Sequence, residues 1–365
     1  MATTALPYLA QIEDCASWNK TVAPFIPQLY ELPARVLSNI GSIDGLRQVY
    51  IETNPLITGF AVSLALAAVF FVVAEFNRNY SQVDRAWSIL PNLYVLHFCL
   101  WARLADVPAN RVEFLASATM VWSARLTYNY NRKGGYNVGS EDYRWAIVKS
   151  KVPAIVFVIF DLAFIATIQS ILLFAFSGAP AYVLLLTSKF EPEITSWDWA
   201  YMSILLGLVF MEWVSDGQQW AFQEAKRAYL RDAKVPADAG FTREELDRGF
   251  VTSGMWALSR HPNFAAEQLV WFMLYQWSCY ASKVLHSWAF AGSASLLLLF
   301  QGSTWLTEAI TAGKYPEYAH YRKKVGCFIP TSIKPYEPKQ PTVIRTSELE
   351  KRHAEKQKAK GKGKK

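Results

Sequence analysis

The chain has 365 residues, of which 52% are apolar or aromatic and only 18% are charged. Soluble domains carry about 25% charged residues, so this composition excludes a disordered or fibrous protein and favours a chain that faces lipid. The net charge of +7 lies in residues 331–365, which hold 11 Lys/Arg and 4 Asp/Glu, while the rest of the chain holds 26 of each sign. A nucleic-acid-binding body would carry its own basic face, so we expect no nucleic-acid partner.

Apolar segments long enough to cross a bilayer recur along the chain. The clearest is 56–74, whose 19 uncharged residues span about 28 Å as a helix, close to the roughly 30 Å hydrocarbon core. The others are 86–102, 112–128, 152–176, 199–216, 265–284 and 287–306. The sequence therefore predicts an all-α, polytopic transmembrane helix bundle with about seven spans, in a range of six to eight. The apolar stretch 180–187 is too short to cross and is predicted to be re-entrant or interfacial.

Basic residues predict the orientation. The loops 129–151 and 217–262 carry five and seven Lys/Arg, whereas 188–198 carries one. With seven spans, both basic loops and the basic tail fall on one side, which the positive-inside rule makes cytosolic. The N-terminus is then lumenal and the C-terminus cytosolic. Of the two glycosylation sequons, Asn19 would be lumenal and Asn79 cytosolic.

Three regions follow from this reading. Residues 1–55 form a lumenal N-terminal segment, 56–330 the transmembrane domain, and 331–365 a disordered basic cytosolic tail. The lysines at the end of the tail would contact anionic lipid headgroups.

Polar residues inside a predicted span indicate function, because burying them in lipid is costly. The fifth span carries five of them at spacings of 4, 3, 4 and 3, which places all five on one helix face. They are Glu212, Asp216, Gln219, Gln223 and Lys226. We expect one long helix that continues into the cytosol with this stripe facing a cavity, although a solvated cytosolic face explains its later members as well.

A second polar group precedes the sixth span. Pro262 suits the first turn of a helix, and the free N–H groups of that turn, flanked by Arg260 and His261, would attract a phosphate. The five histidines show no H-x-x-x-H spacing and no two cysteines form a C-x-x-C pair. No metal site is therefore expected.

Taken together, five motifs resemble the DUF1295 family, a member of the steroid 5α-reductase-like superfamily of integral membrane proteins. The resemblance covers about residues 56–330. The motifs are Ser81–Trp87 (SQVDRAW), Lys133–Tyr136 (KGGY), Asp216–Trp220 (DGQQW), Ser259–Phe264 (SRHPNF) and Tyr315–Tyr321 (YPEYAHY).

The resemblance implies an enzyme of the endoplasmic reticulum membrane that uses NADPH to reduce a C=C bond in a steroid, sterol or enoyl-type lipid. In such reductases an Asn-aromatic-x-Gly-Glu motif contacts NADPH, and this chain matches it with Ala266 in place of the glycine. The cofactor-binding residues that it implies, with those expected from the polar clusters, are Asp216, Gln219, Lys226, Arg260, His261, Asn263, Glu267, Glu308, Lys314, Tyr315, Tyr318 and Arg322.

The catalytic candidates come from the N-terminal half by their chemistry. A tyrosine hydroxyl can hydrogen-bond a substrate carbonyl and polarise the conjugated C=C bond, and a carboxylate can hold that tyrosine in place. Asp84, Tyr128 and Tyr130 are the candidates, and each also fits an ordinary residue of the membrane boundary.

Two alternatives stay open. Isoprenylcysteine and phospholipid methyltransferases share the Arg-His-Pro motif and a late Glu, and their cofactor is S-adenosylmethionine, a cation that needs acids. The mixture of cations and acids here leans towards NADPH. The other alternative is a non-catalytic lipid-binding membrane protein.

Overall fold

The computed structural model describes residues 5–338 and is helical throughout that range, with one isolated bridge between Ser259 and Gly326 instead of a sheet. The predicted all-α class is confirmed. The chain divides into two compact units, one of residues 1–209 and 268–298 and one of 210–267 and 299–365. From residue 339 onwards the predicted basic tail lies outside the described residues.

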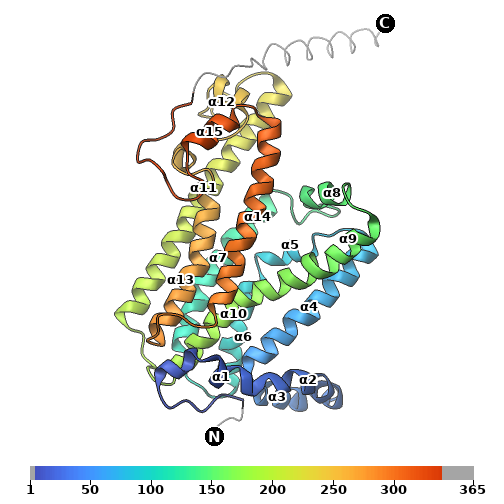
Figure 1. Cartoon of the computed structure of the whole chain (residues 1–365), viewed down its shortest axis with the longest axis vertical. Helices are drawn as coiled ribbons and strands as arrows, with labels where there is room; N and C mark the ends of the chain where they lie inside the picture. The colour runs from blue at the N-terminus through green and yellow to red at the C-terminus, as the bar shows by residue number, and fades with distance from the viewer. Residues whose placement is uncertain (1–4, 339–365) are drawn as a thin grey trace. The chain divides into compact units, whose positions relative to one another are not determined.

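The elements of the first 200 residues follow in chain order in Figure 1. They are η1 (Ile12–Ala16), α1 (Trp18–Thr21), η2 (Ala23–Phe25), α2 (Ile26–Asn39), α3 (Ile43–Glu52), α4 (Pro55–Asn77), α5 (Gln82–Trp87), α6 (Leu90–Leu104), α7 (Asn110–Arg132), α8 (Tyr143–Lys149), α9 (Ala154–Phe160), the π-helix η3 (Asp161–Ile168) and α10 (Gln169–Thr187). The remainder comprises α11 (Ser196–Asp232), α12 (Arg243–Arg248), η4 (Gly254–Ala257), α13 (Pro262–Ala281), α14 (Phe290–Lys314) and α15 (Tyr318–Lys324).

Every predicted span falls largely on a helix, but only two stretches in the described range are long and apolar enough to cross a membrane by length and composition. They are Pro55–Asn77 and Ala154–Thr187. The structure is therefore consistent with a bilayer setting, and the seven spans and their orientation stay predictions. The expectation of a separate short segment at 180–187 is wrong. Pro180 lies inside α10, where close packing buries the whole last turn and overrides the cost of an interior proline.

Aromatic packing holds the first unit together. Four tryptophans are fully buried there, and the indoles of Trp122 and Trp271 meet edge to face with centroids 4.8 Å apart. The Trp101 indole N–H donates to the backbone oxygens of Tyr50 and Thr53, at 3.1 and 3.2 Å. This contact ties the N-terminal helices to α6.

The second unit has two apolar cores of its own. One forms where the end of α11 packs against α12 and η4, around Phe222, Tyr229 and Trp256. The other surrounds Phe250 and contains Tyr315, Tyr318, Tyr321 and Val325. The single helix predicted for the polar stripe is confirmed, since α11 runs unbroken for 37 residues.

Candidate functional site

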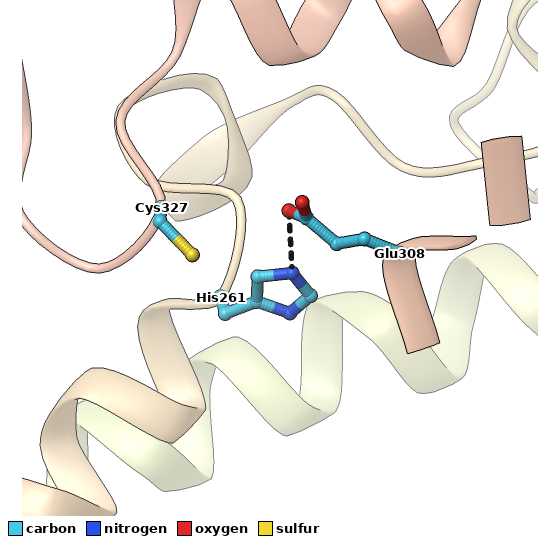
Figure 2. Close-up of side chains that lie close together, drawn as sticks. All are labelled: His261, Glu308 and Cys327. Carbon is cyan, nitrogen blue, oxygen red and sulfur yellow. Dashed lines mark hydrogen bonds and ion pairs between the residues drawn. The ribbon is translucent and has the colours of Figure 1, made fainter. Parts of the chain in front are cut away.

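A buried carboxylate, Glu308 on α14, lies at the centre of the second unit's polar residues. Its Oε1 is 3.0 Å from Nε2 of His261, and Figure 2 shows the imidazole pointing at the carboxylate. His261 directly precedes α13, which begins at Pro262 as the sequence predicted. Both side chains are less than a tenth exposed, so this contact is shielded from water.

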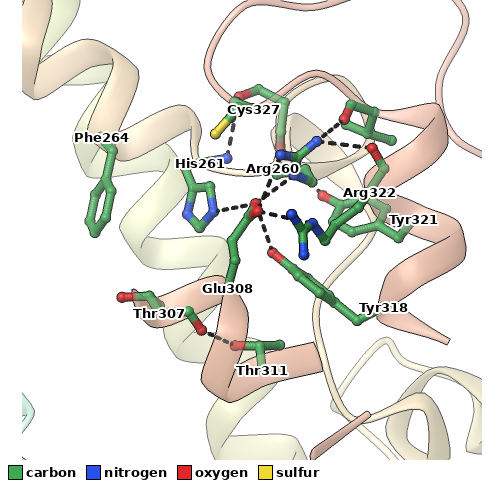
Figure 3. A network of polar contacts seen from close by, with 12 residues as sticks. Arg260, His261, Phe264, Thr307, Glu308, Thr311, Tyr318, Tyr321, Arg322 and Cys327 are labelled. Carbon is green, nitrogen blue, oxygen red and sulfur yellow. Dashed lines mark hydrogen bonds and ion pairs between the residues drawn. The ribbon is translucent and has the colours of Figure 1, made fainter. Parts of the chain in front are cut away.

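Two arginines and a tyrosine complete what we call the Glu308 cluster (Arg260, His261, Glu308, Tyr318 and Arg322), shown in Figure 3. Arg260 donates through Nε to Glu308 Oε1 at 2.6 Å, and Arg322 Nε lies 3.1 Å from Oε2. The Tyr318 hydroxyl donates to Oε1 at 3.2 Å. The structure thus brings together five residues that the sequence assigned to the site.

The electrostatics of the cluster favour an ionised Glu308. Burial alone would raise its pKa, but hydrogen bonds from His261 and Arg260 outweigh burial and hold the pKa at about 2. One carboxylate faces two guanidinium groups, so the cluster keeps an excess of positive charge. Charge-assisted contacts of this kind are short and strong.

Arg260 also has a structural role. Its Nη1 donates to the backbone oxygens of Arg322 and Val325, at 3.1 and 2.5 Å. The backbone N–H groups of residues 260 and 261 donate to the oxygens of Gly326 and Cys327, at 2.9 and 3.0 Å. The segment before α13 and the segment after α15 are therefore fixed side by side.

Cys327 joins His261 and Glu308 to form a set of potential metal ligands within 4.8 Å of one another (Figure 2). The sequence did not indicate this set, because Cys327 is 66 positions after His261. The guanidinium groups of Arg260 and Arg322 already bind the same carboxylate, and their charge opposes a divalent cation there. The residues present do not fit a metal, and the absence of one stays a prediction.

A second group surrounds Tyr315. The Lys226 ammonium, buried on α11, donates to the oxygen of Gly249 at 2.6 Å and to the Tyr315 hydroxyl at 2.5 Å. Lys314 Nζ lies 5.7 Å from the centre of the same ring. Gly249 has φ +86° and an added Cβ would be 2.3 Å from the Tyr315 ring, so only glycine allows this approach.

The rest of the α11 stripe turns inward as predicted. Asp216 is buried and its Oδ1 accepts a hydrogen bond from Nδ2 of Asn263 at 3.0 Å. Gln219, one turn further, is partly buried, and within residues 5–338 its Oε1 has no hydrogen-bond partner. Glu267 is buried on the first turns of α13. Asp216 and Asn263, which lie 47 positions apart, are thus in direct contact.

The catalytic candidates lie in the first unit. Asp84 Oδ2 accepts from the Trp145 indole at 2.7 Å, and burial raises the pKa of Asp84 against the attraction of Arg144. Burial, followed by the charge of Asp84, raises the pKa of Tyr130 to about 12. Tyr128, two positions earlier on α7, is half exposed. Asp84 and Tyr130 interact electrostatically, while Tyr128 lies on another side of the helix.

Comparison with known proteins identifies the family. The model of the family described as "Protein of unknown function (DUF1295)" matches residues 70–325. The chain belongs to the DUF1295 family. It is also 36% identical, over 327 residues, to an uncharacterized protein of Schizosaccharomyces pombe, and this match covers 90% of the chain and 93% of the relative. No solved structure matches. Membership of DUF1295 is consistent with the steroid 5α-reductase-like superfamily.

Two contacts of this DUF1295 site escaped the sequence reading. Trp145, the donor to Asp84, lies in α8, 61 positions away, where a tryptophan reads as a membrane-boundary residue. Gly135 packs so closely on Tyr130 that an added Cβ would lie 2.3 Å from the ring. The Gly134-Gly135 pair was a usable signal, but it indicated a phosphate loop and not a seat for an aromatic ring.

Proposed function

We propose that the protein is a membrane-embedded, NADPH-dependent reductase of a C=C bond in a steroid, sterol or enoyl-type lipid. The observation that carries the proposal is the excess of positive charge around Glu308, where Arg260 and Arg322 face a single carboxylate. NADPH carries a pyrophosphate and a 2′-phosphate, so its site needs cations in excess of acids.

The remaining residues of the second unit fit such a cofactor. Lys226 adds a buried ammonium beside Tyr315, and Gln219 offers a side-chain oxygen that has no hydrogen-bond partner in the described residues. Asn263 lies on the first turn of α13, held by Asp216. When bound, NADPH supplies the hydride, and these side chains would bind its phosphates and orient it.

The first unit supplies groups for the substrate side of the reaction. The Tyr130 hydroxyl can donate a hydrogen bond to a substrate carbonyl conjugated with the C=C bond, which draws electron density from the carbon that accepts hydride. Asp84, fixed by Trp145, sets the charge beside that tyrosine. Tyr128 stays a further candidate from the sequence.

A methyltransferase using S-adenosylmethionine is the second candidate, because three buried acids accompany the cations of the second unit. They are Asp216, Glu267 and Glu308. Glu308 and Asp216 are already hydrogen-bonded to neighbouring side chains, which leaves less free negative charge for a cationic cofactor. A non-catalytic lipid-binding protein is the outcome if neither cofactor binds.

The membrane setting completes the proposal. Valines and a phenylalanine are exposed along α4, a surface that suits lipid: Val62, Val69, Val72, Val73 and Phe76. We place the protein in the endoplasmic reticulum membrane with about seven spans and a cytosolic C-terminus. Glycosylation tests this orientation, since Asn19 should be modified and Asn79 should not. Modification of Asn79 would reverse it.

Binding to variants tests the site. Arg322 is half exposed and makes one ion pair with Glu308, so Arg322→Ala should leave the protein folded while weakening NADPH about tenfold, the size of one charged contact. Lys323→Ala, the adjacent exposed cation, is the matched control and should leave binding unchanged. Equal NADPH affinity in both variants would contradict the assignment of the Glu308 cluster.

A further inference from the structure

The second unit contains a cavity that no part of the proposed site occupies. Its volume is about 420 Å³, and it lies between Ala257 and Leu258, the end of α15 and the segment 331–337. Sites for small ligands typically measure about 300–1,000 Å³. One wall of this cavity therefore comes from residues beyond the DUF1295 match, which ends at residue 325.

Basic side chains dominate the lining. His320, Lys324 and Lys334 line the cavity with one acid, Glu337. Lys324 and Lys334 are exposed, and neither forms an ion pair within residues 5–338. Two lysines that are not neutralised by neighbours in this range make the cavity attractive to an anion.

The walls of the cavity are held in place by hydrogen bonds. Tyr336 N–H donates to the oxygen of Ala257 at 2.9 Å, and its ring meets the Tyr321 ring edge to face at 5.1 Å. Val325, another lining residue, accepts 2.5 Å from Arg260 through its backbone oxygen. Arg260 therefore links this cavity to the Glu308 cluster, so both can belong to one extended site.

We propose that this cavity binds the adenosine 2′-phosphate of NADPH, with Lys324 and Lys334 as the phosphate ligands and Tyr336 and His320 beside the adenosine. The inference rests on the proposed function and assigns it a specificity site. Lysine binds a phosphate monoester as a point charge, and aromatic rings suit a nucleobase. NADH lacks this phosphate, so the cavity would make the enzyme prefer NADPH.

The test uses the detergent-purified full chain and four probes. NADPH, NADH, 2′,5′-ADP and 5′-ADP are titrated against tryptophan fluorescence, for the wild type and for Lys324→Ala/Lys334→Ala. Lys323→Ala is the control, because Lys323 is equally exposed but does not line the cavity. Vesicles containing phosphatidic acid provide a lipid phosphate monoester as a separate arm.

We expect 2′,5′-ADP to bind at least about tenfold more tightly than 5′-ADP, and the double variant to bring the two within about twofold. NADH affinity should not change. NADPH binding with an unaltered preference in the double variant overturns this inference and leaves the reductase proposal standing. Absence of binding by both dinucleotides overturns both. Lysine-dependent binding of phosphatidic acid vesicles without 2′,5′-ADP binding assigns the cavity to lipid and overturns the inference.

Discussion

Replacing Glu308 by glutamine should destabilise the protein by about 3 kcal/mol at pH 7. The carboxylate has a pKa of about 2 in place of its ordinary 4.5, because the hydrogen bonds from His261 and Arg260 outweigh its burial. At about 1.36 kcal/mol per pKa unit, this difference corresponds to about 3 kcal/mol. Glu308→Gln keeps the shape of the side chain and removes the charge that Arg260 and Arg322 face.

The same loss must depend on pH with a defined sign. Because the folded pKa lies below the unfolded one, the contribution of Glu308 is complete above about pH 4.5 and disappears as the pH falls through about 2. At pH 3 about 1.4 kcal/mol should remain. The stability gap between the wild type and Glu308→Gln should therefore shrink by about half between pH 7 and pH 3.

Unfolding in mixed detergent micelles, followed by tryptophan fluorescence, measures both gaps. The matched control is Glu224→Gln, which removes an exposed carboxylate that pairs with Arg227 on the same helix. Exposed pairs contribute little, so this variant should resemble the wild type at both pH values. A gap for Glu308→Gln that stays constant between pH 7 and pH 3, or that matches the control, would refute the electrostatic reasoning.

Three further variants test other parts of the structure. Asp161 is fully buried in η3, and neither carboxyl oxygen has a hydrogen-bond partner within residues 5–338, so Asp161→Asn should raise the melting temperature by at least about 2 °C; a lower melting temperature would show that the acid is stabilising. Gly135→Ala forces a methyl group to within 2.3 Å of the Tyr130 ring and should cost about 1–3 kcal/mol in an unfolding titration; unchanged stability would mean that the ring moves freely. Trp145→Phe removes the indole donor to Asp84 and should cost about 1–3 kcal/mol in the same titration; a neutral effect would remove Trp145 from the site.

Local patterns in the sequence were sufficient where the structure repeats them along one helix. The polar stripe on α11 was predictable because its 4, 3, 4, 3 spacing and its burial arise on a single face. The start of α13 was predictable because proline at the first helical position needs no N–H partner. Both inferences use only neighbouring residues and no tertiary contact.

Contacts between distant segments were beyond such patterns. Arg260 meets Glu308 across 48 positions, and only the fold shows that one carboxylate receives both arginines. Pro180 misled the reading for the same reason, since packing around α10 decides whether an interior proline is tolerated. The family resemblance supplied the residue set of the second unit, and the geometry supplied the partners within that set.

Cofactor binding tests the central proposal most directly. The purified full chain is titrated with NADPH, NADH and S-adenosylmethionine side by side, with quenching of its 14 tryptophans as the signal. The account predicts saturable binding of NADPH, weaker binding of NADH and none of S-adenosylmethionine. Binding of S-adenosylmethionine alone, or of none of the three by folded protein, would contradict it.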